Sequence, residues 1–441
     1  MSRRLFEFLS TTEPLDDLFS DASVLTAMLR FESALARVEA RFGVIPETAA
    51  PAIERAANPA AFDAAAIARS ARRSGTITQP LVEALTARVR DADPNAATFV
   101  HWGATSQDVS DTALVLCLTG AATILATDHS RLTAGLKRVS EQHAGTVMLA
   151  RTLMQPAPPT TLGLKAAGWY GAVTRTGTRM MEAFDEASVL QFGGASGTLA
   201  ALGSQGTAVA AALAKELDLR LPDAPWHSHR DRLATLVAAC GVYVGAIGKI
   251  ARDVALLMQF EVAEAAEPGG GSSTMPHKRN PAGSAAALAA ATRVPGLVAD
   301  VLAGMPQEHE RGLGNWHAEA VTVVSIVQAT GAALAAIAGV IEALTVDSAR
   351  MGANIAATGG LVFAEKVMML LAPKLGREAA GRHIKSAMST AAREGQSFLT
   401  ALGAIPEVTA ALSATELVSL DSPEAYLGSA EEFRRRLLNS E

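Results

Sequence analysis

The chain is poor in cysteine, in aromatic residues and in clustered positive charge. Cys117 and Cys240 are the two cysteines among 441 residues, and both lie in apolar segments, so we expect neither a disulfide framework nor a cysteine metal site. The chain has no basic block, and 38 basic against 44 acidic residues give a net charge of −6. This balance argues against nucleic acid or an anionic membrane as a partner. Acidic residues precede any apolar run at the amino terminus, so we expect no signal peptide and a cytoplasmic protein.

Long uncharged runs are also rare, and the clearest covers residues 320–341. This run is long enough to span a bilayer. However, it is diluted by alanine, glycine, threonine and glutamine, has no aromatic belt and stands alone. We therefore predict a helix buried on every side within a bundle, and no membrane span.

Alternating patterns of apolar and polar residues are missing too, so we expect no sheet. Apolar residues instead repeat every three or four positions over residues 24–42, with Ser20 and Asp21 as a cap and Gly43 as a stop. A second stripe predicts a helix from about Arg232 to Glu264. Helices of this length seldom pack alone, which favours a multi-helix bundle shared between subunits.

Changes in the length and spacing of apolar segments along the chain predict three all-α domains. Short apolar segments give way to longer ones near residue 110, and after residue 346 short segments punctuated by glycine and proline return. We assign residues 1–110 to an amino-terminal helical domain, 111–346 to a central long-helix bundle and 347–441 to a small carboxy-terminal helical domain.

The segment GGGSSTMPHKRNP, residues 269–281, is unlike its alanine-rich surroundings. It is not a P-loop, because that motif needs GxxxxGK[ST] after a strand, whereas here two serines precede Lys278. The glycines let backbone amides approach a ligand, Ser272 and Ser273 supply hydroxyls, and Lys278 and Arg279 supply positive charge. The alanine run that follows predicts a helix whose amino terminus also favours anions. These features indicate an anionic ligand under a closing loop, although a solvated surface loop would explain the segment if it stood alone.

Two other polar segments lie in similar surroundings: FVHWGATSQDVSDTAL at residues 99–114 and ARTLMQPAPPTTLGLK at residues 150–165. Together with the loop, they closely resemble the three signature regions of the fumarase/aspartase superfamily. Within it, HWGATSQD, LQFGGASGTLAALGS, PWHSHRDRL and MPQEHERGLGNWHAE look most like the bacterial 3-carboxy-cis,cis-muconate cycloisomerases. The resemblance covers nearly the whole chain.

This resemblance implies an all-α, three-domain fold whose central helices join four subunits, with each active site built from three chains. It implies no metal or cofactor and a small polycarboxylate substrate. The expected reaction is lactonization of 3-carboxy-cis,cis-muconate. The alternatives are a 3-sulfomuconate cycloisomerase, a fumarate-releasing lyase of the adenylosuccinate or argininosuccinate type, and a non-catalytic structural protein on the same scaffold.

The resemblance also assigns residues. Ser272 matches the serine that exchanges a proton with the carbon beside a substrate carboxylate, and Lys278 and Asn280 match residues that hold that carboxylate. Thr105 and Ser106 match ligands of a substrate carboxylate. The other expected substrate-binding residues are His101, Arg151, Gln155, Thr160, Ser273 and Met275. We also expect Arg311 to contact an anion, with a salt bridge between subunits as the equal alternative.

The sequence departs from the lyases at Leu153, where they generally carry a histidine that acts as general acid for a leaving nitrogen. Leucine cannot supply a proton. In a cycloisomerase the nucleophile is a carboxylate of the substrate, which is ionised at neutral pH because its ordinary pKa is near 4. Leu153 therefore favours ring closure over amine release.

Several other polar features are explained as well by structural roles as by substrate binding. His227 and His229 are as consistent with capping or ion pairing as with substrate contact. We expect His129, His143 and His383 to be solvated. The glycine-rich residues 193–206 lack dinucleotide-loop spacing and predict a tight turn between helices.

Overall fold

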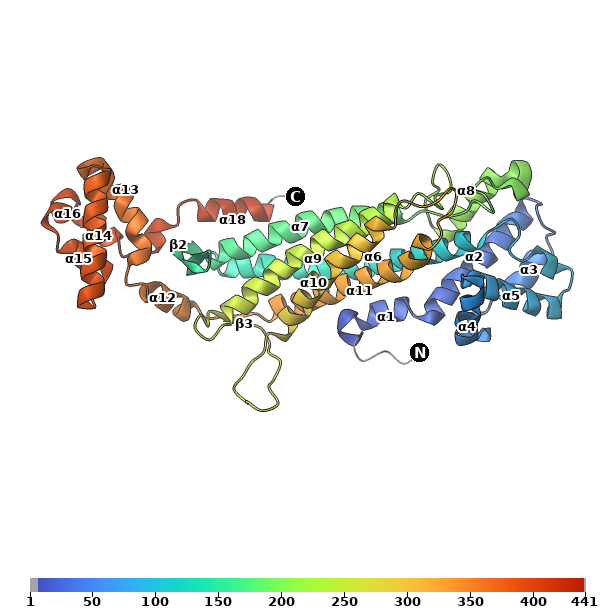
Figure 1. The fold of residues 1–441 in the computed structure, drawn as a ribbon, viewed down its shortest axis with the longest axis horizontal. Helices are drawn as coiled ribbons and strands as arrows, with labels where there is room; N and C mark the ends of the chain where they lie inside the picture. Colours follow the sequence, from blue (N-terminus) through green and yellow to red (C-terminus); the bar gives the residue numbers. More distant parts are fainter. Residues whose placement is uncertain (1–6, 440–441) are drawn as a thin grey trace. The chain divides into compact units, whose positions relative to one another are not determined.

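The computed structural model describes residues 7–439 and is built almost wholly from helices (Figure 1). This confirms the all-α prediction. The two arginines of the amino-terminal segment lie outside the described residues. The chain divides into two compact units, one of residues 1–130, 175–248 and 286–336, the other of residues 131–174, 249–285 and 337–441. The three predicted domains and their boundaries stay a prediction.

Five long helices run through the middle of the sequence: α6 (Ser106–Gln142), α7 (Leu162–Ala187), α9 (Asp231–Leu257), α10 (Ala282–Ala303) and α11 (Asn315–Glu342). Shorter helices precede or separate them: α1 (Glu13–Leu18), α2 (Asp21–Arg41), α3 (Ala49–Ala56), α4 (Ala64–Ser74), α5 (Thr78–Ala92) and α8 (Gly206–Leu217). The carboxy-terminal helices are α12 (Ser348–Ala356), α13 (Ala364–Leu375), α14 (Arg377–Glu394), α15 (Phe398–Gly403), α16 (Pro406–Ala411), α17 (Ala414–Ser419) and α18 (Ala430–Asn439).

Helix α2 begins where its sequence predicts. The Ser20 hydroxyl accepts a hydrogen bond from the Ser23 amide at 3.3 Å, which caps the first turn. Met28, Phe31 and Val38, from the predicted stripe, are fully buried, and α2 packs against α3 and α8.

Helix α9 is shorter than predicted and ends at Leu257 instead of continuing to about Glu264. The chain turns back because Ala263 adopts a left-handed conformation (φ 52°) and the Glu264 amide donates to the Leu257 carbonyl at 2.9 Å. The turn puts the Glu264 side chain in a fully buried position.

By length and composition alone, four described helices, α6, α9, α10 and α11, could cross a membrane, or five spans are possible if the bent pair over residues 348–375 counts as one. The prediction that residues 320–341 are buried on every side is only partly right for the single chain. Residues 323–341 are all buried or half-buried, whereas Val321 is 68% exposed. In α10, only 22% of the most apolar 18-residue stretch is buried.

The prediction of no sheet is wrong for the second signature segment. Strands β1 (Val147–Thr152) and β2 (Gln155–Thr161) form an antiparallel hairpin, and β3 (Ala265–Ala266) pairs with β4 (Thr345–Val346). Three prolines in β2 disfavour a helix there, since proline lacks an amide hydrogen and clashes with the preceding turn. Leu153 and Met154 form the two-residue turn with φ of 50° and 65°, the positive values that such hairpin turns require.

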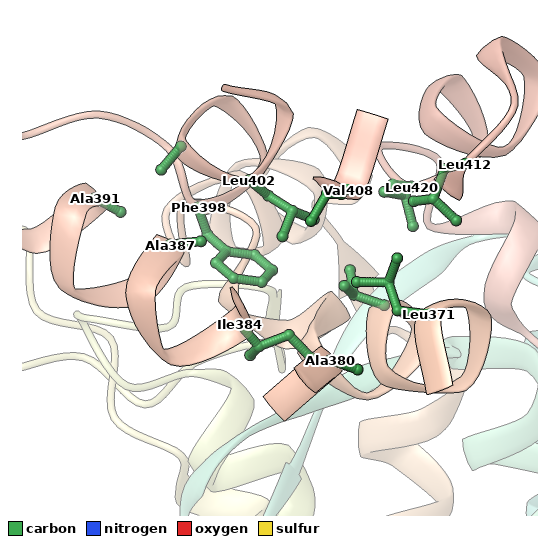
Figure 2. Close-up of a cluster of buried hydrophobic side chains, with 12 residues drawn as sticks. Leu371, Ala380, Ile384, Ala387, Ala391, Phe398, Leu402, Val408, Leu412 and Leu420 are labelled. Carbon is green, nitrogen blue, oxygen red and sulfur yellow. The ribbon is translucent and has the colours of Figure 1, made fainter. Parts of the chain in front are cut away.

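The carboxy-terminal helices α13 to α17 share a core of their own (Figure 2). Phe398 and Leu402 of α15 pack there with Leu371 of α13 and Ile384 of α14. All four side chains are buried, so these helices are joined by apolar contacts drawn from within residues 364–420.

Candidate active site

The first signature segment forms the turn that leads into α6 and the first residues of that helix. His101 has a positive φ of 59°, and its Nδ1 lies 2.6 Å from Oε1 of Glu32, a fully buried residue of α2. Burial alone would lower the pKa of His101, but the charge and hydrogen bond of Glu32, together with the charge of Asp108, raise it.

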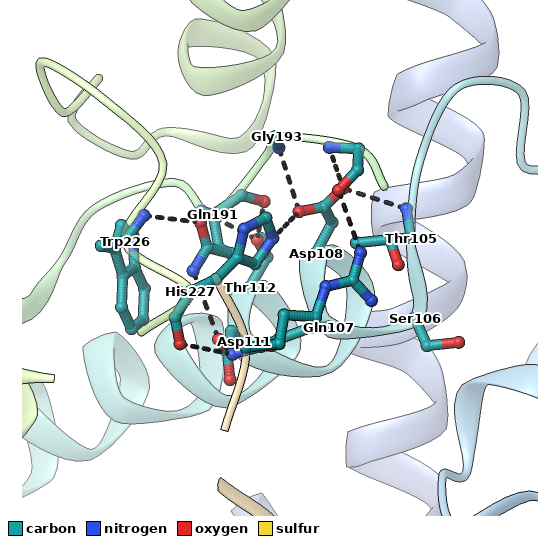
Figure 3. A network of polar contacts seen from close by, with 12 residues as sticks. Thr105, Ser106, Gln107, Asp108, Asp111, Thr112, Gln191, Gly193, Trp226 and His227 are labelled. Carbon is teal, nitrogen blue, oxygen red and sulfur yellow. Dashed lines mark hydrogen bonds and ion pairs between the residues drawn. The ribbon is translucent and has the colours of Figure 1, made fainter. Parts of the chain in front are cut away.

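Asp108 fixes this turn from the first turn of α6 (Figure 3). Its Oδ2 accepts hydrogen bonds from the amides of Thr105 at 3.0 Å and Gly194 at 2.9 Å. Its Oδ1 accepts from the Gly193 amide at 3.0 Å and lies 2.7 Å from Nε2 of His227. The carboxylate therefore holds the turn with Thr105 and Ser106 against the glycine-rich segment.

Close backbone approach explains the glycines of that segment. A Cβ on Gly194, where φ is 69°, would lie 2.7 Å from the Gly103 carbonyl oxygen. The segment connects α7 to α8, but through a loop and a short 3-10 helix (Ala200–Gln205), so the predicted tight turn is wrong. The sequence did not reveal that its amides serve as donors to Asp108.

Behind Asp108 lies a buried ion network around Arg230. The guanidinium contacts Asp111 at 2.7 and 3.1 Å and also pairs with Glu319, while Trp316 Nε1 donates to Asp111 at 3.0 Å. Burial would raise the pKa of Asp111, but Arg230 lowers it; burial raises the pKa of Glu319 despite the same partner.

The contact with Asp108 settles the open interpretation of His227 in favour of structure, since the His227 side chain is buried and its Nε2 lies 2.7 Å from Oδ1 of Asp108. Sequence reasoning missed Asp108, Asp111 and Glu319. The i, i+3 spacing of SQDVSD on a helix was the available signal. Arg311, expected to contact an anion, donates through Nη2 to the carbonyls of Gly194 at 3.1 Å and Ala195.

The second signature segment is the β1–β2 hairpin. Arg151 forms a bidentate pair with buried Glu264, at 3.0 Å (Nη1 to Oε2) and 2.7 Å (Nη2 to Oε1). Asn354 Nδ2 also donates to Glu264, at 2.7 Å. Gln155 is exposed at the start of β2 and Thr160 is half-buried near its end. Leu153 is 96% exposed at the hairpin tip, so in the single chain it fills no buried space.

The third segment is a loop whose two ends are fixed together. Gly270 and Asn280 exchange backbone hydrogen bonds of 3.1 and 2.9 Å, and Asn280 Nδ2 donates to the Gly271 carbonyl at 3.3 Å. Within the loop, the Ser272 hydroxyl oxygen accepts from the amides of Met275 at 3.0 Å and Thr274 at 3.4 Å. The other predicted residues of the loop, Ser273, Met275 and Lys278, are exposed.

Helix α10 starts directly after the loop, as predicted, but its amino terminus is already occupied by an anionic side chain. Glu267 accepts hydrogen bonds from the amides of Gly283 at 2.7 Å and Ser284 at 3.2 Å, and from the Ser284 hydroxyl at 2.6 Å. The expectation that this helix end attracts an outside anion is therefore wrong. The helix end instead fixes the base of the loop.

Two of the histidines expected to be solvated have protein partners. His129 Nδ1 lies 2.8 Å from the Tyr243 hydroxyl, and burial lowers the pKa of His129. His143 Nδ1 lies 3.1 Å from Oγ1 of Thr146. The expectation is wrong for both residues, since each is half-buried and burial lowers the pKa of each.

Comparison with known proteins matches this chain to a family described as Lyase over residues 7–296 and to one described as Adenylosuccinate lyase C-terminus over residues 360–437. A 3-carboxy-cis,cis-muconate cycloisomerase of Bradyrhizobium diazoefficiens is 49% identical over 424 residues, which cover 95% of this chain and 94% of that protein. One of Pseudomonas aeruginosa is 47% identical over 441 residues, which cover 99% and 96%.

Among solved structures, the 3-carboxy-cis,cis-muconate lactonizing enzyme of Pseudomonas putida matches with a TM-score of 0.94 and 44% identity, over 99% of this chain and 98% of that one. The match covers both compact units and all three signature segments. The chain therefore belongs to the lyase family of the fumarase/aspartase superfamily.

Proposed function

We propose that the protein is a 3-carboxy-cis,cis-muconate cycloisomerase, which closes its substrate to 4-carboxymuconolactone in protocatechuate breakdown. The observation that carries this proposal is the near full-length similarity to the Bradyrhizobium cycloisomerase. We propose no cofactor, because both the bond that forms and the proton that moves can be handled by side chains and by the substrate itself.

In this reaction one substrate carboxylate adds across a conjugated double bond, and a proton is delivered to the carbon beside another carboxylate. The nucleophile is already ionised and needs no base. We assign the proton delivery to Ser272. A serine hydroxyl is a weak acid, and the two amides that donate to its oxygen would stabilise the alkoxide left after proton transfer.

Negative charge accumulates on the carboxylate beside the reacting carbon. Lys278 supplies a cation for it and Asn280 an amide donor, while the glycines let loop amides approach. His101, Thr105 and Ser106 would hold the remaining carboxylates. Gln155, Thr160, Ser273 and Met275 complete the proposed binding surface.

The two arginines of the predicted site take different roles in this proposal. Arg151 is already paired with Glu264, and Arg311 bonds the glycine-rich segment. We assign both arginines to shaping the hairpin and the turn around the substrate. Their positive charges would also attract the anionic groups of the substrate.

We further propose a soluble, cytoplasmic homotetramer whose active sites draw on three chains. The support is the apolar surface that the single chain leaves exposed. Only 22% of the most apolar 18-residue stretch of α10 is buried, and Val242 on α9 is 57% exposed. Faces of this kind are covered in multi-helix bundles by other helices. The proposed partners are small polycarboxylates and copies of the chain, with no nucleic acid and no membrane.

A spectrophotometric screen tests the function. The purified protein is given 3-carboxy-, 3-sulfo- and unsubstituted cis,cis-muconate, with adenylosuccinate and argininosuccinate in parallel. We expect the highest kcat/KM on 3-carboxymuconate. Preference for the sulfonate would change the substrate, and fumarate release from either succinate would replace the proposed function with an amine-releasing lyase.

A further inference from the structure

Helix α2 carries two glutamates whose side chains are almost fully out of solvent. Glu32 and Glu39 are each 1% exposed and lie seven residues apart, two helical turns along the same face. Burying a carboxylate is costly unless it is paired or neutralised. Among the described residues, Oε2 of Glu32 and both oxygens of Glu39 have no hydrogen-bond partner. Neither residue belongs to a signature segment, so the resemblance to known enzymes does not explain why these two carboxyl groups are buried.

Glu32 has one partner, and that partner is a predicted substrate-binding residue. Its Oε1 lies 2.6 Å from Nδ1 of His101, whose side chain is 17% exposed. The bond joins residues 69 positions apart and takes one ring nitrogen, which fixes the ring and its protonation at that position. Among the described residues, Nε2 of His101 has no hydrogen-bond partner.

We propose that Glu32 is a positioning residue, which holds His101 by Nδ1–H so that Nε2–H is presented to a carboxylate of the substrate. The inference rests on the proposed function, because it gives His101 an anionic ligand to meet. The Nε2–H of a protonated imidazole is a charge-assisted donor to carboxylate, roughly twice as strong as a neutral one.

The charges around the ring agree with this role. The charges of Glu32 on α2 and Asp108 on α6 act on the ring, Glu39 is coupled to Glu32, and His227 Nε2 lies 2.7 Å from Oδ1 of Asp108. Glu32 and Asp108 raise the pKa of His101 in spite of its burial. Burial, and then the charge of Glu32, raise the pKa of Glu39 to about 9, so Glu39 is neutral where Glu32 pairs with the ring.

The experiment compares Glu32→Gln with Glu32→Asp and with Glu39→Gln as the matched control on the same helix face. For wild type, kcat/KM on 3-carboxymuconate should fall as pH rises through the pKa of His101. In Glu32→Gln this fall should begin at lower pH, and kcat/KM at neutral pH should drop roughly 10- to 100-fold, the range typical when the hydrogen-bond partner of a metal-ligating histidine is removed. Glu32→Asp should restore part of the loss, and Glu39→Gln should keep the wild-type profile.

A labelling arm works without turnover. Diethyl pyrocarbonate modifies neutral imidazole, and peptide mass spectrometry gives the pH of half-modification of His101. We expect this pH to fall in Glu32→Gln only. If it is the same in wild type and Glu32→Gln, the pairing role is wrong. If the pH of half-modification falls in Glu32→Gln as expected but the protein does not convert 3-carboxymuconate, the proposed function is wrong and the Glu32–His101 pairing stands.

Discussion

At the scale of single residues, the roles proposed for Ser272 and Lys278 separate in kinetics. Ser272→Ala removes the proton carrier and leaves the cation, so kcat should fall by about 10²–10⁴-fold with little change in substrate affinity. Lys278→Met removes charge that meets the substrate before and during reaction, so binding and kcat should both suffer. Single-turnover rates and binding constants measure both, and Thr274→Ala, which keeps its backbone amide, is the control. Turnover by Ser272→Ala within about tenfold of wild type would point to another proton donor.

Glu39 gives a second residue-scale prediction, for stability. Its pKa is raised to about 9 in the folded chain by burial and then by Glu32, from an ordinary value near 4.5. The folded state thus keeps a proton that the unfolded state has lost between these values, and stability from this group declines as pH rises through that window. Glu39→Gln cannot ionise, so its Tm relative to wild type should increase from pH 5 to pH 9. Equal Tm differences at both pH values would mean that Glu39 is ionised in the fold.

The residues of the loop could be found from sequence because their motif is contiguous, but their supports could not. Glu32 contacts His101 across 69 positions and Arg151 meets Glu264 across 113. A buried glutamate within an amphipathic stripe reads as an exception to the pattern until its distant partner is known. Glu267, which occupies the end of α10, is separated from it in sequence by the whole loop.

At the scale of elements, the β1–β2 hairpin is fixed to the turn after α9 by Arg151. In Arg151→Met the Glu264 carboxylate would stay buried without its cation, which typically costs about 3–5 kcal/mol. We expect a clear loss of stability in chemical denaturation, largely recovered in the Arg151→Met/Glu264→Gln double variant.

The exposed pair of Arg382 and Glu378 on α14 is the comparison. Both side chains are more than half exposed, so Arg382→Met should change stability by less than about 1 kcal/mol. If Arg151→Met is as stable as wild type while KM rises, then Arg151 serves the substrate and not the hairpin.

Element prediction succeeded where local signals agreed and failed where two signals competed. The cap at Ser20 and the stripe that follows it gave α2 nearly to the residue. In the second signature segment, Leu153 and Met154 adopt positive φ without glycine or asparagine, the usual turn signals, so the hairpin was not recognisable. The end of α9 was missed because its apolar period continues past Leu257 to Met258 and no proline or glycine marks the turn.

At the scale of the whole molecule, the proposed tetramer depends on apolar helix faces that the single chain leaves open. Val242 lies on α9 and is 57% exposed. Val242→Glu would bury a charge in the proposed bundle and should produce dimers or monomers in sedimentation velocity, with loss of activity. Val242→Thr keeps the shape and should stay tetrameric. A wild-type chain that is monomeric and active at working concentration would contradict the assembly and the three-chain site together.

The hydrogen-bonded ends of the loop over residues 269–281 have a consequence for limited proteolysis. Lys278 and Arg279 are exposed and lie between the paired residues Gly270 and Asn280. Trypsin should therefore cut there first and give two fragments, which remain associated because the Glu267 contacts to α10 and the long helices on both sides are untouched. Gel filtration of the nicked protein should show the intact size, while denaturing gels show the two pieces. Saturating substrate analogue should slow the cut, and separation of the fragments on nicking would mean that the base of the loop does not hold by itself.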